Sequence, residues 1–408
     1  TLRIHHVVPP FPQSIHGKFH ILFAHARQLH LTLHLLLRRG PSYDVYFVDQ
    51  LSTCIPFLRT FGKTRVVFYC HFPDKLLANG EFVEGRFANI KGGVLKRLYQ
   101  IPMDWVEELT TRQADIILAN SKFTSRVFQT YFRSIPRVPR IVYPGINVSA
   151  YEAAVDLSDP DIVQVLSDRP TLLSLNRFEK KKNVALALAA FAQMKTGTTR
   201  LVIGGGYDHR LEDNIQTLAA LVSAAELHFL TFNIVTPTSS NTPIPTFKCQ
   251  HTEPDVLFVL NFTTGQRSAL LTSSSTLCLL YTPANEHFGI VPVEGMLCGL
   301  PVLACDSGGP TESVLDSPER TSWLCWPDAA VWADALSKIV ALSKEEREAL
   351  SERAKSQAKT LFGMESMARG IEDALQEASA LGPVEGLSGF IFIFATLLAL
   401  GMAILVLI

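Results

Sequence analysis

The chain lacks the features that mark secreted, zinc-binding or nucleic-acid-binding proteins. Its seven cysteines are an odd number, and no Cys-x2-Cys pair occurs among them, so neither a disulfide framework nor a zinc site is predicted. The net charge is −1, which provides no overall attraction to nucleic acid. No basic segment followed by an apolar one opens the chain, so no signal peptide is predicted. We therefore expect a globular protein in a reducing compartment, with cysteines as small core residues.

The length predicts two domains, because 408 residues exceed what one hydrophobic core usually organises. A linker rich in Asp and Ser, at about residues 149–170, separates two similar halves. We predict an N-terminal domain over residues 1–160, a C-terminal domain over 161–380 and a separate apolar segment over 387–408.

Both halves alternate apolar runs with helical stretches, which predicts α/β domains with doubly wound parallel sheets, like the Rossmann fold. A helix is expected over residues 18–39, and residues 231–255 lack a periodic pattern and are predicted to form a variable loop. A capping box formed by Ser343 and Glu346 predicts the start of a late helix. The predicted strands are 2–8, 43–48, 64–70, 115–119 and 140–143 in the first half, and 171–175, 200–203, 256–260, 276–281 and 301–305 in the second.

The richest motif is Pro283-Ala-Asn-Glu-His-Phe-Gly-Ile-Val-Pro-Val-Glu294, which follows a predicted strand and opens a predicted helix. Gly289 has no Cβ, so a bound anion can approach the positive end of the helix dipole. Glu286 and Glu294 flank it in the Glu-x7-Glu spacing of retaining glycosyltransferases, and Glu294 can accept hydrogen bonds from sugar or ribose hydroxyls. The spacing alone also occurs at the start of ordinary amphipathic helices.

Two cations and a histidine follow other strand ends, where functional residues of a parallel sheet gather. Arg177 and Lys182, in Asn176-Arg-Phe-Glu-Lys-Lys-Lys-Asn183, can converge on a diphosphate, although a lysine run is often a solvated loop. His71, in Tyr69-Cys-His-Phe-Pro-Asp74, can hydrogen-bond a sugar, with Asp74 either fixing its tautomer or holding the loop. A lone histidine at a strand end is also often structural.

Two segments suggest a membrane. Residues 387–408 carry no charge and are predicted to form a C-terminal hydrophobic helix that spans or anchors to a bilayer; the alternative is a buried helix. Residues 86–97 hold four cations and no acid among apolar side chains. That segment fits either an anionic membrane surface or a solvated helix face.

Taken together, the motifs resemble the family of eukaryotic α1,3/1,6-mannosyltransferases that extend the dolichol-linked oligosaccharide. The resemblance runs from about residue 10 to about residue 375. It is carried by Asn176–Asn183, Leu280–Glu294, Ser307-Gly-Gly-Pro310, Phe47-Val-Asp-Gln50 and Tyr69–Asp74.

The resemblance implies a retaining GT-B enzyme, with two Rossmann-like domains, on the cytosolic face of the endoplasmic reticulum membrane. Its donor would be GDP-mannose, its acceptors Man-GlcNAc2 and Man2-GlcNAc2 diphosphodolichol, and its linkages α1,3 and then α1,6. Early dolichol-pathway transferases are further implied partners, and no cofactor or metal is expected beside the donor. The implied catalytic residues are His71 and Glu286, and the implied donor-binding residues are Arg177, Lys182, His287, Phe288, Gly289 and Glu294.

Two other functions remain open on the sequence. One is a nucleotide-sugar transferase acting on another lipid, since the donor motifs would be shared. The other is an inactive member that acts as a membrane scaffold, because family members begin with a strand and a Gly-Gly loop that this sequence does not contain. The sequence therefore predicts an N-terminally truncated chain of uncertain activity.

Overall fold

The computed structural model describes residues 4–15, 19–37, 43–77, 94–194, 197–243, 251–316, 320–384 and 389–405. The chain forms two compact units. The first comprises residues 1–143 and 367–408, and the second comprises 144–366. These limits differ from the sequence-based ranges 1–160 and 161–380, because the chain returns to the first unit within a late helix.

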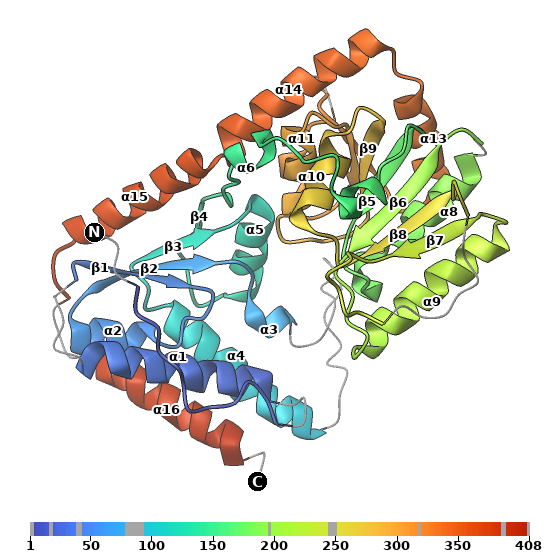
Figure 1. Ribbon diagram of the computed structural model, residues 1–408. Coiled ribbons are helices and arrows are strands. Elements are labelled where there is room, and N and C mark those ends of the chain that lie inside the picture. Colours follow the sequence, from blue (N-terminus) through green and yellow to red (C-terminus); the bar gives the residue numbers. More distant parts are fainter. Residues whose placement is uncertain are drawn as a thin grey trace. The chain divides into compact units, whose positions relative to one another are not determined.

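The first unit contains a parallel four-stranded sheet in the order β1-β2-β3-β4 (Figure 1). The two central strands are short apolar runs that are almost wholly buried, as interior parallel strands require, whereas the two outer strands are more exposed. All four strands confirm the predictions for residues 43–48, 64–70, 115–119 and 140–143. The strands are β1 (Val45–Asp49), β2 (Arg65–Cys70), β3 (Ile116–Ala119) and β4 (Arg140–Ile141).

Helices cover both faces of this sheet. Ile55 and Leu58 pack with Phe68 and Phe128 in a core on one face, while Ala374 packs with residues of the other face. The helices are α1 (His20–Leu37), α2 (Ile55–Gly62), α3 (Asp74–Leu77), α4 (Val94–Thr111), α5 (Lys122–Tyr131), α15 (Met364–Ala380, from Met367 in this unit) and α16 (Gly389–Leu405).

The second unit contains a parallel seven-stranded sheet in the order β11-β10-β9-β5-β6-β8-β7. The predicted strands of this half are all confirmed. The strands are β5 (Thr171–Leu175), β6 (Arg200–Gly205), β7 (Phe232–Val235), β8 (Val256–Leu260), β9 (Thr276–Tyr281), β10 (Val302–Cys305) and β11 (Trp323–Cys325). Their side chains form a continuous core with α8, α9 and α13, in which Trp332 is fully buried.

The helices of the second unit connect these strands as parallel topology requires. Ser343 and Glu346 form the predicted capping box at the start of α14. The helices are α6 (Ser149–Glu152), α7 (Pro160–Val163), the 3₁₀ turn η1 (Lys180–Lys182), α8 (Ala185–Met194), α9 (Glu212–Leu227), α10 (Thr264–Thr272), α11 (Ile290–Leu297), α12 (Pro310–Ser313), α13 (Ala329–Val340) and α14 (Lys344–Phe362).

Two sequence predictions are wrong. Residues 4–9 form no strand, and their apolar side chains are not buried, with Ile4 84% and Val8 74% exposed. Within residues 231–255, which were predicted to be a loop, β7 adds an edge strand to the sheet. The sequence pattern did not indicate this four-residue strand, because the residues around it are mostly polar. Residues 244–250 of that segment lie outside the described residues.

The C-terminal apolar run forms α16, which packs against α4 and α2. Leu400 meets Met103 in a small cluster, while Ile391 and Phe394 on another side of α16 are 71% and 70% exposed. None of the helices in the described ranges is long and apolar enough to cross a bilayer, so the predicted span at 387–408 is not found there. The side chains of the cationic segment 86–97 lie outside the described residues.

Buried His25 makes the first unit sensitive to acid. Its Nδ1 is hydrogen-bonded to the Thr53 hydroxyl, and burial lowers the pKa of His25 to about 4. The unfolded chain, with an ordinary pKa near 6.5, binds the proton more readily between about pH 4 and 6.5, so stability falls as pH drops through this window. We expect a loss of about 2 kcal/mol at pH 5 relative to pH 8 from this group.

The variant His25→Gln isolates this contribution. Hydrogen exchange at the amides of β2 and β3 would measure the unfolding free energy of the first unit at both pH values. The difference between pH 8 and pH 5 should shrink by about 2 kcal/mol in the variant, since other titrating groups are common to both proteins. An unchanged difference would show that His25 does not carry the effect.

Candidate active site

The loops after β5 and β9 are neighbours because of the strand order in the second unit. β5 is the first strand of this sheet along the chain but lies in its middle, where it pairs with β6 on one side and β9 on the other. The chain therefore leaves β5 and β9 in opposite directions, and such a switch point is where open parallel sheets bind ligands, beyond the carboxyl ends of the strands. Lys182 follows β5 and Glu286 follows β9.

Lys182 and Glu286 form an ion pair between these two loops, from Nζ to Oε2. The Thr282 hydroxyl donates to the Lys182 carbonyl at 2.7 Å, which ties the same loops through the backbone. Burial raises the pKa of the Glu286 carboxyl, but Lys182, His287 and a hydrogen bond from Tyr281 outweigh it and hold that pKa below its ordinary value. Glu286 is therefore a carboxylate at neutral pH, held beside a cation.

A glycine pair from the loop after β10 supports the backbone around Glu286. Gly309 N–H donates to the Glu286 carbonyl at 2.7 Å, and Gly308 has φ +69°. A Cβ at Gly309 would lie 2.3 Å from Phe288 Cα and carbonyl oxygen, so a side chain there would force the two loops apart. Ser307 Oγ accepts from Asn285 N–H at 3.0 Å. The motif Ser307-Gly-Gly-Pro310 thus acts as a backbone clamp.

Helix α11 begins at Ile290, shortly after the backbone of residues 285–288 that this clamp holds. Gly289 is its N-cap with φ +79° and no side-chain cap, a conformation that favours glycine. Phe288 is buried and contacts Phe362 edge-on, with ring centroids 5.5 Å apart. The positive end of the α11 dipole therefore opens beside Glu286, as the sequence analysis predicts, and it suits an anion.

Glu294 lies within α11, where it is buried and has hydrogen-bond partners. Its Oε1 accepts from Arg267 Nη1 of α10 at 3.0 Å and from the Tyr151 hydroxyl of α6. Burial, and then the hydrogen bond to Glu294, raises the pKa of Tyr151, so the phenol stays a donor. The role of Glu294 toward ribose stays a prediction.

The other predicted donor-binding residues follow the same two strands, β5 and β9. Arg177 side chain is 60% exposed and pairs with Glu179 at 2.8 Å, so the structure joins Lys182, but not Arg177, to Glu286. His287 is half-buried next to Glu286 in the chain. Across the described ranges, no group of three His, Cys, Asp or Glu side chains is placed to hold a metal ion.

His71 lies in the first unit, immediately after β2. Its Nε2 is 2.8 Å from Asp49 Oδ1 at the end of β1, and its ring stands edge-on to Tyr69. Asp74, the partner suggested by the sequence, begins α3, where its N–H donates to Glu107. The histidine is therefore oriented by the neighbouring strand end, because the parallel register places Asp49 beside Tyr69.

Comparison with known proteins matches both parts of the chain to glycosyltransferases. Residues 2–150 match the Glycosyltransferase Family 4 model, and residues 249–357 match the Glycosyl transferases group 1 model. The alpha-1,3/1,6-mannosyltransferase ALG2 of Rhizomucor pusillus is 37% identical over 95% of this chain and 82% of its own length. ALG2 of Homo sapiens is 36% identical over 79% of this chain and 71% of its own. The chain belongs to the alpha-1,3/1,6-mannosyltransferase family.

This mannosyltransferase has the GT-B fold that the sequence predicts. It is similar to sucrose-phosphate synthase from Thermosynechococcus elongatus, with a TM-score of 0.63 and 17% identity over 89% of this chain and 79% of that one. It is also similar to Anabaena HepE, whose structure contains UDP-glucose, with a TM-score of 0.57 and 16% identity over 86% and 81% of the two chains. At these identities the likeness concerns the fold.

Several residues that contact the candidate site residues of the mannosyltransferase escaped the sequence analysis. Tyr281, the last residue of β9, hydrogen-bonds Glu286, and its position at a strand end was an available signal. Asp49 also ends a strand and lies within a motif that carried the family resemblance. Arg267 and Tyr151 carry no such signal, because only the packing of α10 and α6 brings them to Glu294.

Proposed function

We propose that this mannosyltransferase moves mannose from GDP-mannose to a diphosphodolichol-linked acceptor. The first acceptor is Man-GlcNAc2 and the second Man2-GlcNAc2, with an α1,3 linkage made before an α1,6 linkage. The names of the relatives supply the linkages, and the resemblance in the motifs supplies donor and acceptor. The observation that carries the proposal is the Lys182 and Glu286 pair at the switch point, held against the start of α11.

The donor diphosphate would lie against Lys182 and the first turn of α11. Transfer breaks the bond between mannose C1 and the β-phosphate oxygen, so negative charge grows on GDP. A lysine ammonium and the N–H groups of a helix N-terminus would stabilise that charge. Because these groups are already oriented before the reaction, their stabilisation of the transition state is large. Arg177, exposed in the same loop after β5 as Lys182, would leave Glu179 and join the diphosphate as a guanidinium fork.

Glu286 would contact the mannose as it is transferred. Its low pKa keeps it ionised, so it can accept hydrogen bonds from mannose hydroxyls and stabilise positive charge at C1. The acceptor hydroxyl forms the new bond to C1, and its proton passes to the β-phosphate oxygen that leaves with GDP. His71, oriented by Asp49 in the first unit, is proposed to bind the sugar, as the resemblance implies. Glu294 would bind the ribose.

The acceptor is a lipid, so the enzyme must work at a membrane. We propose the cytosolic face of the endoplasmic reticulum membrane, as the resemblance implies. The exposed apolar residues Ile391, Phe394 and Leu397 of α16 would meet the bilayer surface, since a patch of large apolar side chains lowers its free energy by leaving water. Other early dolichol-pathway transferases are proposed as partners at the same surface.

Product analysis tests the proposed activity. The purified chain would be incubated with GDP-mannose and a short lipid-diphosphate chitobiose-mannose acceptor, and the products would be digested with linkage-specific mannosidases. We expect one α1,3- and then one α1,6-mannose. UDP-glucose and UDP-GlcNAc serve as donor controls and should give no product.

Two outcomes would replace the proposal. Transfer to a different lipid acceptor from the same donor would indicate another lipid glycosyltransferase. Failure to transfer from any donor, together with unchanged complementation of a glycosylation-deficient cell by the variant Glu286→Gln, would indicate an inactive scaffold.

A further inference from the structure

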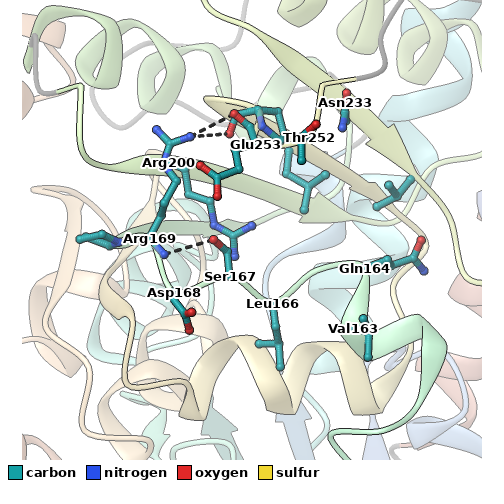
Figure 2. Close-up of a pocket in the computed structure, with 14 residues that line it drawn as sticks. Val163, Gln164, Leu166, Ser167, Asp168, Arg169, Arg200, Asn233, Thr252 and Glu253 are labelled. Carbon is teal, nitrogen blue, oxygen red and sulfur yellow. Dashed lines mark hydrogen bonds between the residues drawn. The ribbon is translucent and has the colours of Figure 1, made fainter.

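The second unit contains a pocket at the opposite edge of its sheet from the donor motifs. Its volume is about 750 Å³, within the range of small-molecule sites. It lies where β5, β6 and β8 begin, whereas Lys182 and Glu286 follow strand ends. Figure 2 shows the side chains that line it, which include Gln164, Leu166, Asp168, Arg169, Arg200, Asn233, Val235, Glu253 and Leu257.

Arg200, the first residue of β6, supplies a buried cation to this pocket. Its side chain donates only to uncharged groups, from Nε to Thr171 Oγ1 at 2.9 Å and from Nη2 to the Val165 carbonyl at 2.7 Å. The residue is 5% exposed, and no carboxylate among the described residues forms an ion pair with it. A buried guanidinium without a counter-ion is costly, so the pocket offers a strong place for an anion.

The neighbouring Arg169 is different, because both terminal nitrogens of its guanidinium are engaged, one of them with a carboxylate. It pairs with Asp255 at 3.3 Å and donates to the carbonyls of Thr199, Glu253 and Pro254. It therefore holds the walls of the pocket together and adds a second positive charge near Arg200. Burial, and then the charge of Arg169, lowers the pKa of Arg200 to about 10, so it remains a cation at neutral pH.

The rim and walls narrow the class of ligand. Asp168 and Glu253 are exposed acids on the rim, and carboxylates there accept hydrogen bonds from hydroxyl groups. Leu166, Val235 and Leu257 supply apolar wall. A ligand with one anionic group and several hydroxyls would satisfy the buried cation and the rim together, which neither a neutral sugar nor an apolar molecule would do.

We propose that this pocket binds a small phosphorylated or carboxylated polyol, with its anionic group on Arg200 and its hydroxyls toward Asp168 and Glu253. The site is separate from the donor site and uses none of its residues. Phosphate and carboxylate share the charge and acceptor chemistry that Arg200 recognises.

Calorimetric titration tests the site on the whole chain. Glucose 6-phosphate, gluconate, inorganic phosphate and glucose would each be titrated with saturating GDP and again without it. Binding of one or both organic anions, weaker binding of phosphate and none of glucose is expected, with affinities that GDP does not change. Competition by GDP would overturn the proposal by placing the anion in the donor site, and absence of anion binding would overturn it outright.

Variants separate the charge of the pocket from its structural role. Arg200→Gln should weaken binding of the organic anion about tenfold or more. Asp168→Asn removes an exposed rim charge and should strengthen binding of inorganic phosphate about twofold, which loss of folding would not mimic. Lys182→Ala is the matched control, with GDP binding weakened and the pocket unchanged. Phosphate affinity unaltered by both Arg200→Gln and Asp168→Asn would contradict the assignment.

Discussion

Replacement of Lys182 by alanine is expected to lower the rate of mannose transfer at least about a hundredfold. Among the described residues, Lys182 is the one lysine or arginine that forms an ion pair with Glu286. In the proposed mechanism its ammonium group stabilises the negative charge that grows on the leaving GDP. Loss of a preorganised charge in a partly buried site is not replaced by water. Initial rates with GDP-mannose and the short lipid-linked acceptor, together with GDP affinity by calorimetry, would measure the effect.

Lys181→Ala is the matched control, because the two lysines are neighbours in the same turn. Lys181 pairs with Glu179 at 3.1 Å, and its side chain is 54% exposed, so its contribution should be small. Transfer should stay within about twofold of the unsubstituted rate. Equal losses in both variants would mean that the lysine run acts only through its overall charge, and the role of Lys182 would have to be abandoned.

The variant Gly309→Ala is expected to abolish measurable donor binding and transfer. A Cβ at this position would lie 2.3 Å from Phe288 backbone atoms, a distance that requires the two loops to separate. Separation would break the 2.7 Å hydrogen bond from Gly309 N–H to the Glu286 carbonyl. It would also move the start of α11 away from Lys182. Overpacking of this kind also costs about 1–3 kcal/mol of stability.

Gly206→Ala provides the comparison for this glycine. A Cβ there would approach only the Arg177 side chain, with Cγ at 3.4 Å and Cδ at 3.8 Å, so donor binding should be retained. The readouts are GDP affinity and the thermal unfolding temperature. If Gly309→Ala kept full GDP affinity, the backbone clamp would not be part of the donor site.

Much of the fold follows from local sequence. Buried parallel strands such as β5 and β8 are continuous apolar runs with clear ends, and a pattern of this kind is readable without tertiary information. β7 escaped because its four residues lie among Thr, Pro and Asn, and only pairing with β8 makes them a strand. The opposite error occurred at residues 2–8, where an apolar run predicted a strand. The Val8 side chain is 74% exposed, so its apolar character does not reflect burial in a sheet.

The site was predictable in its chemistry but not in its pairings. Glu286 and Lys182 were identified from their places after strands, and strand order then explains why residues 104 positions apart meet. The sequence could not show that they pair with each other while Arg177 pairs with Glu179. Nor could it favour Asp49 over Asp74 as the partner of His71, because nearness along the chain pointed to Asp74 and strand register decided for Asp49.

The central claim is that the donor diphosphate binds where β5 and β9 diverge. A crystal structure of the chain with GDP would test it most directly. We predict phosphate oxygens within hydrogen-bonding distance of Lys182 Nζ and of the first N–H groups of α11, with the Lys182 contact to Glu286 lengthened. GDP found elsewhere on the second unit, with the ion pair between Lys182 and Glu286 intact, would contradict the account.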